Sequence, residues 1–198
     1  MLGGAGDDLI LGGAGNDRLF GGTENDQLFG DVGNDQLDGE DGDDLLSGDG
    51  YKSPSADLID GGAGTDTVQT EWNEMASTTV DGPLATVTLA GGADDGRPGE
   101  GDDVRSVEHL DLYVSGSFTG TAQADRIAVN RQGRDSTLTG LGGDDELVAS
   151  EGNDRLDGGA GDDRIDAGFG DDHIVGGPGR DRIFGDHPDP HWIAGPSP

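Results

Sequence analysis

The sequence predicts an all-β fold, a coil built from tandem nine-residue units. Glycine-rich units recur with a fixed nine-residue period from Gly3 to Gln69 and again from Gly140 onward, which is the signature of a repeat architecture. Aspartate dominates the sixth position of the units, and a large apolar residue stands two places later. Each unit is therefore expected to be a glycine-rich loop followed by a very short strand whose central side chain points inward.

The first block of repeats covers residues 3–69. Its units read GGAGDDLIL, GGAGNDRLF, GGTENDQLF, GDVGNDQLD and GEDGDDLLS, followed by a unit lengthened by four residues over 48–60 and by GGAGTDTVQ. Glu24 stands where the fourth-position glycine belongs, so we expect a distorted loop around Asp26. The lengthened unit makes a pair between Asp35 and Asp57 doubtful.

The second block covers residues 140–186 and reads GLGGDDELV, ASEGNDRLD, GGAGDDRID, AGFGDDHIV and GGPGRDRIF. Between the blocks, residues 70–139 lack a regular period, but apolar residues over 84–89 and 104–112 predict irregular strands that continue the coil. The pattern returns in weak form near Gly120, first with Asp125 and then with Ser136 where the aspartate belongs, so we expect a strand without a metal at Ser136. The acidic glycine loop over 91–103 is either a further cation site or a solvated turn. A Pro-rich tail over 187–198 ends the coil, with Trp192 as a candidate cap.

The sixth-position aspartates are candidate metal ligands. Glycines let the loop turn tightly and aim its carbonyls at one point, and carbonyl oxygens with a carboxylate form the ligand set that calcium prefers. The fifth position is often Asp or Asn, for which we favour local hydrogen bonds that stabilise the turn. The candidate ligands are Asp8, Asp17, Asp26, Asp35, Asp44, Asp57, Asp66, Asp145, Asp154, Asp163, Asp172 and Asp181.

This pattern resembles the repeats-in-toxin (RTX, hemolysin-type) calcium-binding repeat, G-G-x-G-x-D-x-U-x, in which U is a large apolar residue. The resemblance implies a parallel β-roll, or β-solenoid, with two nonapeptides per turn and two blocks joined by an irregular β segment. It also implies a calcium ion between the loops of units i and i+2, so the units offer eight candidate pairs, of which we expect about six to hold an ion. The resemblance further implies that the protein is secreted by a bacterium or lies on its surface.

The composition predicts that folding depends on this calcium. The formal net charge is −31, and Leu, Ile, Val and Phe together make up just under a fifth of the 198 residues. These two properties are typical of a disordered chain, so we expect metal binding and folding to be one event. The acidity also argues against nucleic acid as a partner. No apolar stretch is long enough for membrane insertion, and the absence of cysteine excludes disulfides.

No catalytic motif accompanies the repeats, and the carboxylates form a ladder rather than a pocket. We therefore predict a non-catalytic calcium-binding module that folds on exposure to extracellular calcium. The alternatives are a structural or adhesive spacer array, or the C-terminal module of an exported toxin or hydrolase whose catalytic domain is absent from this chain. No secretory signal precedes the first repeat. A coil that presents a flat polar face to ice or polysaccharide ranks last, because outward residues such as Arg18, Gln27 and Leu45 form no regular row.

Overall fold

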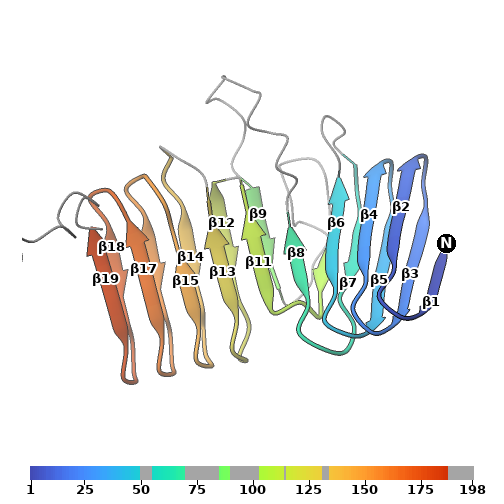
Figure 1. Ribbon diagram of the computed structural model, residues 1–198. Coiled ribbons are helices and arrows are strands. Elements are labelled where there is room, and N and C mark those ends of the chain that lie inside the picture. Colours follow the sequence, from blue (N-terminus) through green and yellow to red (C-terminus); the bar gives the residue numbers. More distant parts are fainter. Residues whose placement is uncertain (50–54, 70–84, 90–102, 114, 131–133, 187–198) are drawn as a thin grey trace, which may run out of the picture.

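The protein is an elongated coil of short parallel β-strands that runs from β1 at one end to β19 at the other (Figure 1). The structure is a computed structural model, and it describes residues 1–49, 55–69, 85–89, 103–113, 115–130 and 134–186. Every regular element in these ranges is a strand, which confirms the predicted all-β class.

The strands form three sheets. The first sheet contains β1 (Leu2–Ala5), β3 (Arg18–Thr23), β5 (Gln36–Asp41), β7 (Leu58–Asp60) and β10 (Asp103–Arg105). The second and longest sheet runs from β2 (Leu9–Ala14) through β4 (Gln27–Val32), β6 (Leu45–Asp49), β8 (Thr67–Gln69), β11 (His109–Leu112), β13 (Arg126–Val129), β15 (Glu146–Val148) and β17 (Arg164–Gly168) to β19 (Arg182–Asp186). The third contains β9 (Ala85–Thr88), β12 (Gly116–Thr119), β14 (Thr137–Thr139), β16 (Arg155–Asp157) and β18 (His173–Val175).

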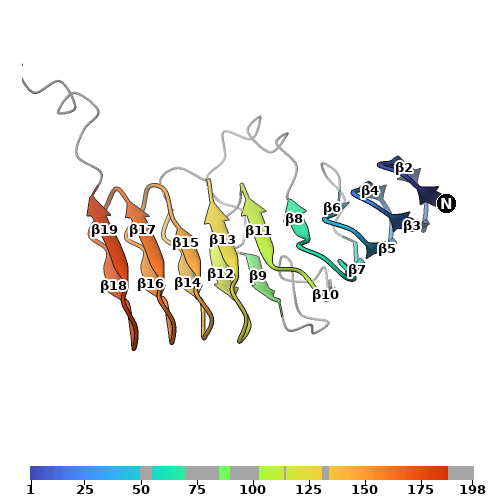
Figure 2. The same cartoon turned by 60° about the horizontal axis from the view of Figure 1, so that its bottom comes forward.

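Each turn of the coil contains two nonapeptides. Within the repeat blocks, paired strands are parallel and mostly 18 residues apart in register, so that Leu19 lies beside Leu37 and Leu156 lies beside Ile174. The lengthened unit makes the separation 22 residues between β5 and β7 and between β6 and β8. Successive units therefore alternate between the long sheet and one of the five-stranded sheets, which follow each other along the opposite side (Figure 2). This arrangement confirms the predicted parallel β-solenoid with two repeat blocks joined by an irregular β segment.

The core is a single row of eighth-position side chains, one above the other, between the sheets. These apolar residues point inward because side chains on a strand alternate between its two faces. Leu19, Leu28, Leu37, Leu46, Leu147, Leu156 and Ile165 are all 0% exposed. The row continues through the linking segment with Leu110, Phe118, Ile127 and Leu138. It becomes exposed to solvent at the C-terminal end, where Ile183 is 47% exposed.

The linking segment continues the coil without following the order of the chain. Strands β10 and β11 add the next turn by pairing with β7 and β8. Strand β9 precedes both of them in the sequence but pairs with β12, and so lies beyond β10 along the coil. The acidic loop up to residue 102 and the tail with Trp192 lie outside the described residues.

The loops depend on a left-handed backbone at the second and fourth positions, where glycine is the residue that bears it best. Gly22 and Gly42, for example, have φ values of 124° and 152°. Glu24, at a fourth position, adopts φ 76° and so keeps the left-handed backbone of the glycine it replaces. Asp31, Glu40 and Leu141 do the same at second positions, with φ of 72°, 72° and 79°.

Candidate metal centre

Sixth-position residues form a continuous row along the edge of the long sheet where its strands begin. We call this row of residues the long row. Because His109 in β11 is in register with both Thr67 and Arg126, the residue before it, Glu108, occupies the same place as Asp66 and Asp125. The long row therefore comprises Asp8, Asp26, Asp44, Asp66, Glu108, Asp125, Asp145, Asp163 and Asp181.

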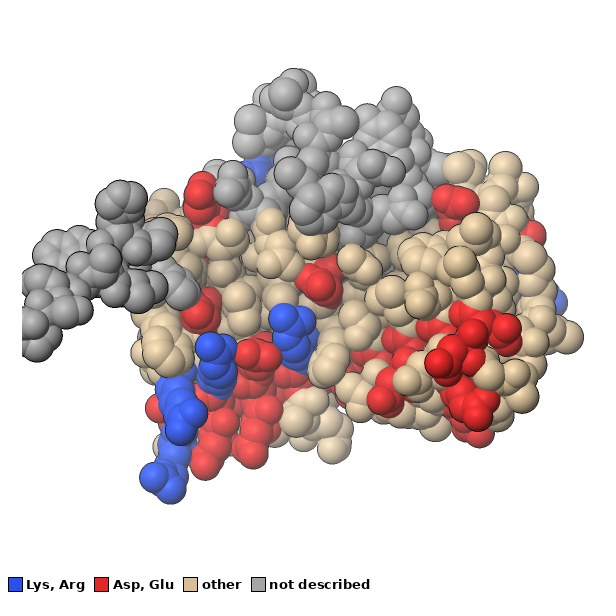
Figure 3. Space-filling model, in the orientation of Figure 1, with Lys and Arg blue, Asp and Glu red and all other residues tan. Residues whose placement is uncertain are grey.

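Two shorter rows lie where the strands of the five-stranded sheets begin. The first consists of Asp17, Asp35 and Asp57, and the second of Ser136, Asp154 and Asp172. The structure thus places all twelve candidate aspartates at equivalent positions on successive turns. Acidic side chains gather along the lower part of the face seen in Figure 3, with arginines beside them at the C-terminal end.

Hydrogen bonds join the sixth-position residues of neighbouring turns. The backbone amide of each donor binds Oδ1 of the aspartate one turn further on, as in Asp8 to Asp26 and Asp26 to Asp44, both at 2.8 Å. The amide of Asp35 donates to Asp57 at 2.8 Å as well, so the four-residue lengthening leaves this pair in contact. Asp26 retains its bonds on both sides despite Glu24. One carboxylate oxygen of each acceptor is therefore fixed by the fold.

Fifth-position side chains form a second ladder in the opposite direction. The amide of Asp43 donates to Oδ1 of Asn25 at 2.9 Å, and the amide of Asp162 donates to Oδ1 of Asp144 at 2.8 Å. The expectation that these residues bond locally within their own turn is wrong for these pairs, because the partners are 18 residues apart. Parallel stacking places the same loop position of the next turn within hydrogen-bond distance, so the fifth-position side chains link each turn to its neighbour.

In ten of the sixth-position aspartates, the second carboxylate oxygen is buried and receives no hydrogen bond from the residues that the structure describes. This Oδ2 atom is almost inaccessible to solvent, and a buried acceptor without a donor normally costs free energy. The oxygens concerned belong to Asp8, Asp17, Asp26, Asp35, Asp44, Asp66, Asp145, Asp154, Asp163 and Asp172. Unpartnered anionic oxygens repeated on turn after turn fit a bound cation.

Backbone carbonyls point at the same places as these oxygens. A Cβ added to Gly21 would lie 2.5 Å from Oδ2 of Asp26 and 2.6 Å from the carbonyl oxygen of Gly39. The same pair of oxygens recurs at Gly3, where Oδ2 of Asp8 and the carbonyl of Gly21 are each 2.6 Å from the added atom. First-position glycine thus leaves room for a carboxylate and for a carbonyl from the next turn, although Ala149 and Ala167 occupy this position in two later units. Carbonyl with carboxylate is a calcium ligand set.

Side chains alone do not complete such a site. Among the described residues, no group of three or more acidic or histidine side chains gathers around one point. Any calcium held here must therefore take much of its oxygen shell from backbone carbonyls and water, as calcium sites commonly do.

Burial raises the pKa of several of these carboxyl groups. The pKa of Asp66, Asp145 and Asp154 rises from 3.8 to about 6, mainly through desolvation and further through neighbouring carboxylates such as Asp44 for Asp66 and Asp125 for Asp145. Desolvation raises the pKa of Asp35, Asp44 and Asp163 as well. A neighbouring cation would lower these raised pKa values, because an opposite charge favours the ionised form of a carboxyl group.

Sequence reasoning missed one member of the long row and gave no ligand role to a second. Glu108 accepts a hydrogen bond from the amide of Asp66 at 2.9 Å, in the manner of a sixth-position aspartate. Its signal was the spacing Glu108-x-Leu110, which matches the spacing of aspartate and apolar residue in the repeats. Asp125 donates its amide to Asp145, but its own Oδ2 accepts a hydrogen bond from the Thr121 hydroxyl at 3.0 Å. Asp125 is therefore satisfied without a metal.

Ser136 stands where a repeat unit has its sixth-position aspartate, so this turn keeps the inter-turn hydrogen bond but lacks the carboxylate. Its amide donates to Asp154 at 2.6 Å, so the ladder passes through it, while its buried hydroxyl finds no hydrogen-bond partner among the described residues. The strand geometry predicted here is present, and the anionic oxygen of the other turns is absent because serine has none.

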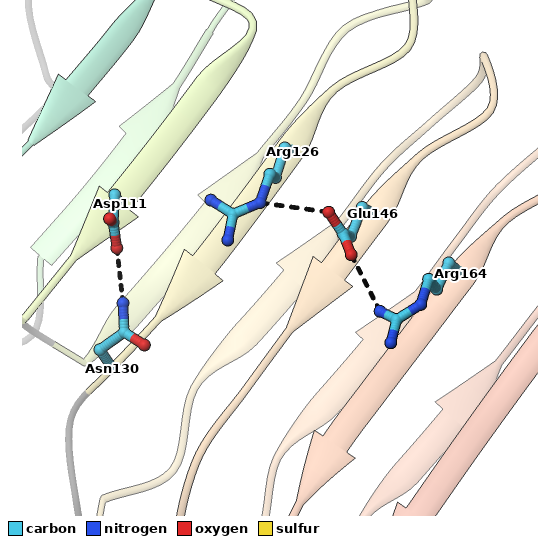
Figure 4. Close-up of polar contacts among 5 residues, drawn as sticks. All are labelled: Asp111, Arg126, Asn130, Glu146 and Arg164. Atoms are coloured by element: carbon cyan, nitrogen blue, oxygen red, sulfur yellow. Dashed lines mark hydrogen bonds and ion pairs between the residues drawn. The ribbon is translucent and has the colours of Figure 1, made fainter. Parts of the chain in front are cut away.

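The outer face of the long sheet carries cross-strand polar contacts (Figure 4). Glu146 forms ion pairs with Arg126 at 3.1 Å and with Arg164 at 2.9 Å, and Asn130 donates to Asp111. These side chains are more than a third exposed at the ion pairs, so each pair contributes about 0–1 kcal/mol to stability. None of the described residues forms a helix able to span a bilayer.

In a comparison with known protein families, the RTX calcium-binding nonapeptide repeat matches this chain over residues 1–28, 20–50, 53–71, 139–174 and 166–186. These segments cover more than half of the chain and coincide with both predicted repeat blocks. No curated protein matches the chain.

Proposed function

Because the chain belongs to the RTX calcium-binding nonapeptide repeat family, we propose that its rows of buried aspartates hold a series of calcium ions between successive turns. The ligands are the twelve sixth-position aspartates, about six ions are held, and the chain itself performs no catalysis. The observation that supports this most strongly is the set of buried Oδ2 atoms that receive no hydrogen bond, repeated along both blocks.

The protein's own residues contribute position and charge. In all of these aspartates except Asp8 and Asp17, which begin their rows, one carboxylate oxygen is held by the amide of the preceding turn, which leaves Oδ2 free to face the loop. Glycine at the first position lets the carboxylate lie over the backbone, and the carbonyl of the next turn points to the same region. Bound calcium would supply the positive charge that allows these stacked carboxylates to ionise together.

We further propose that the chain folds when it reaches calcium-rich surroundings outside the cell. Extracellular calcium-binding modules typically have dissociation constants of about 0.1–1 mM. At about 1 mM calcium and a dissociation constant of order 100 μM, each site adds roughly 1.4 kcal/mol, so several sites supply stability on the scale of a whole domain.

A second candidate role is a stiff structural spacer, alone or beside a catalytic or adhesive domain in a longer chain. The observation in its favour is the unbroken nine-stranded sheet that connects both repeat blocks. A rod of this kind would hold its two ends at a fixed separation once it is folded.

Direct measurement of bound calcium tests the proposed function. Equilibrium dialysis of the whole chain should give about six ions per chain with affinities in the range given above, and magnesium should not displace them, because it demands a strict octahedron and keeps its waters. A chain that binds no calcium at millimolar concentration would contradict the proposal.

A further inference from the structure

We propose that the junction between the two blocks contains an additional cation site, formed by Asp66 of the last repeat of the first block with Glu108 and the carbonyl of Ser106 from the linking segment. This inference rests on the proposed function. It assigns a metal-binding role to residues outside any nonapeptide and makes the linking segment part of the ion row.

The linking segment imitates a repeat unit at this point. Strand β11 pairs with β8 in the same register as a repeat strand, with Leu110 beside Val68 in the core. Glu108 stands two residues before Leu110, where a repeat has its aspartate, and its Oε2 accepts the Asp66 amide at 2.9 Å. Neighbouring turns of the first block use an aspartate Oδ1 for the same bond, as Asp66 does for Asp44 at 2.8 Å.

The backbone carbonyl required at such a site is also present. A Cβ added to Gly61 would meet the carbonyl oxygen of Ser106 and lie 2.6 Å from Oδ2 of Asp66. At Gly39 the corresponding neighbours are Oδ2 of Asp44 and the carbonyl of Gly61. Ser106 therefore takes the place of a first-position glycine in presenting its carbonyl.

An unsatisfied anionic oxygen points into this space. Asp66 is 0% exposed, and its Oδ2 has no hydrogen-bond partner in the part of the chain that the structure describes. Glu108 brings a second carboxylate to the same pair of turns, and its charge and that of Asp44 act against ionisation of Asp66. Two acidic side chains with a buried unpaired oxygen and a convergent carbonyl match the ligand chemistry of calcium.

The next turn does not offer the same chemistry. Oδ2 of Asp125 is already bonded to Thr121, through the backbone amide at 2.5 Å and the hydroxyl at 3.0 Å. The proposed ion at Asp66 and Glu108 is therefore the last of the first series, and it anchors the linking segment to the first block.

The test compares the number of calcium ions bound by the whole chain with that of Glu108→Gln. Glutamine keeps an oxygen that accepts the Asp66 amide but removes the carboxylate charge, so the strands should still form at millimolar calcium while one ion fewer is bound. Glu146→Gln is the matched control, because it removes the same charge from the outer face of the same sheet; it should bind the wild-type number. Equal numbers of ions in Glu108→Gln and wild type would overturn the junction site.

A second comparison decides the matter if Glu108→Gln fails to fold. Asp66→Asn should lose two ions, since Asp66 would belong both to the site with Asp44 and to the junction site, whereas Asp8→Asn, at the end of the long row, should lose one. A loss of one ion in both variants would overturn the junction site while leaving the proposed function intact. A wild-type chain that binds no calcium would instead remove the proposed function.

Discussion

At the residue scale, the fold uses the two oxygens of a sixth-position carboxylate differently. Oδ1 of Asp44 accepts the amide of Asp26, while its Oδ2 is buried without a donor. Oδ1 serves only as a hydrogen-bond acceptor, and the side-chain oxygen of an asparagine could accept the same bond. Under the proposed function the second oxygen binds a cation, and for this reason asparagine, which keeps an acceptor but loses the charge, separates the two roles.

Asp44→Asn should therefore weaken calcium-dependent folding strongly. Asp44 is shared by the pairs with Asp26 and Asp66, so the loss of both sites should cost roughly 3 kcal/mol at about 1 mM calcium and raise the calcium midpoint of folding. Circular dichroism during a calcium titration measures this midpoint.

Asp43→Asn provides the control at the adjacent residue. It removes the same charge, but the oxygen that accepts the Thr65 amide at 2.8 Å is retained, and Asn25 already fills this role one turn earlier. Its calcium midpoint should stay near the wild-type value. Similar shifts in both variants would mean that charge in general, rather than the buried oxygen, governs the midpoint.

The sequence was sufficient to place the candidate ligands of both blocks, because a nine-residue period assigns every aspartate to an equivalent position. Glu108 was not predicted as a ligand, since it lacks the preceding glycines and its partner Asp66 is 42 residues away. The inter-turn bonds of Asn25 and Asp144 were also missed. A turn residue that can bond locally gives no sign of a closer partner one coil turn away.

At the scale of the element, a strand of the repeat blocks typically buries one large apolar side chain, at the eighth position of its unit. Strand β4, for example, buries Leu28 at 0% exposure, while Val32 in the same strand is 44% exposed. A core one residue wide leaves little room for rearrangement around a cavity.

Leu28→Ala should destabilise the calcium-saturated protein by about 2–5 kcal/mol, because the removed side chain leaves a cavity between the sheets. Leu11→Ala, at a position that is 58% exposed, should change stability by no more than about 0.5 kcal/mol. Urea unfolding at constant calcium compares the two. Equal losses would mean that the row of eighth-position residues is not the core.

The strands of the repeats could be predicted from their pattern, but the place of β9 could not. Its alternation, with Val87 and Leu89 buried, indicates a strand. Nothing in that alternation specifies that it pairs with β12 while the later β10 pairs with β7. Pairing across a long connection is decided by which edges are free, and a single local pattern does not contain that information.

At the scale of the whole molecule, the formal net charge of −31 opposes a compact state in which carboxylates are stacked turn upon turn. Two agents can relieve this repulsion, protons and calcium. The raised pKa values give the direction of the proton effect.

Acidification should stabilise the calcium-free fold. The pKa of Asp66, Asp145 and Asp154 is about 6 in the fold, against an ordinary value of 3.8, so the fold binds more protons than the unfolded chain between these values. The resulting stabilisation is complete below about pH 3.8 and is lost as the pH rises through about 6. In metal-free buffer, circular dichroism should show more strand at pH 4.5 than at pH 7.5; less strand at the lower pH would contradict the assigned burial.

The most direct test of calcium-dependent folding is the hydrodynamic radius of the whole chain at pH 7.5, measured in millimolar calcium and again after exhaustive dialysis against a chelator, with magnesium as the control. We expect a compact particle in calcium and an expanded, coil-like chain both without metal and in magnesium. A chain that stays equally compact after calcium is removed would contradict the claim that bound cations hold the stacked carboxylates, and with them the solenoid, together.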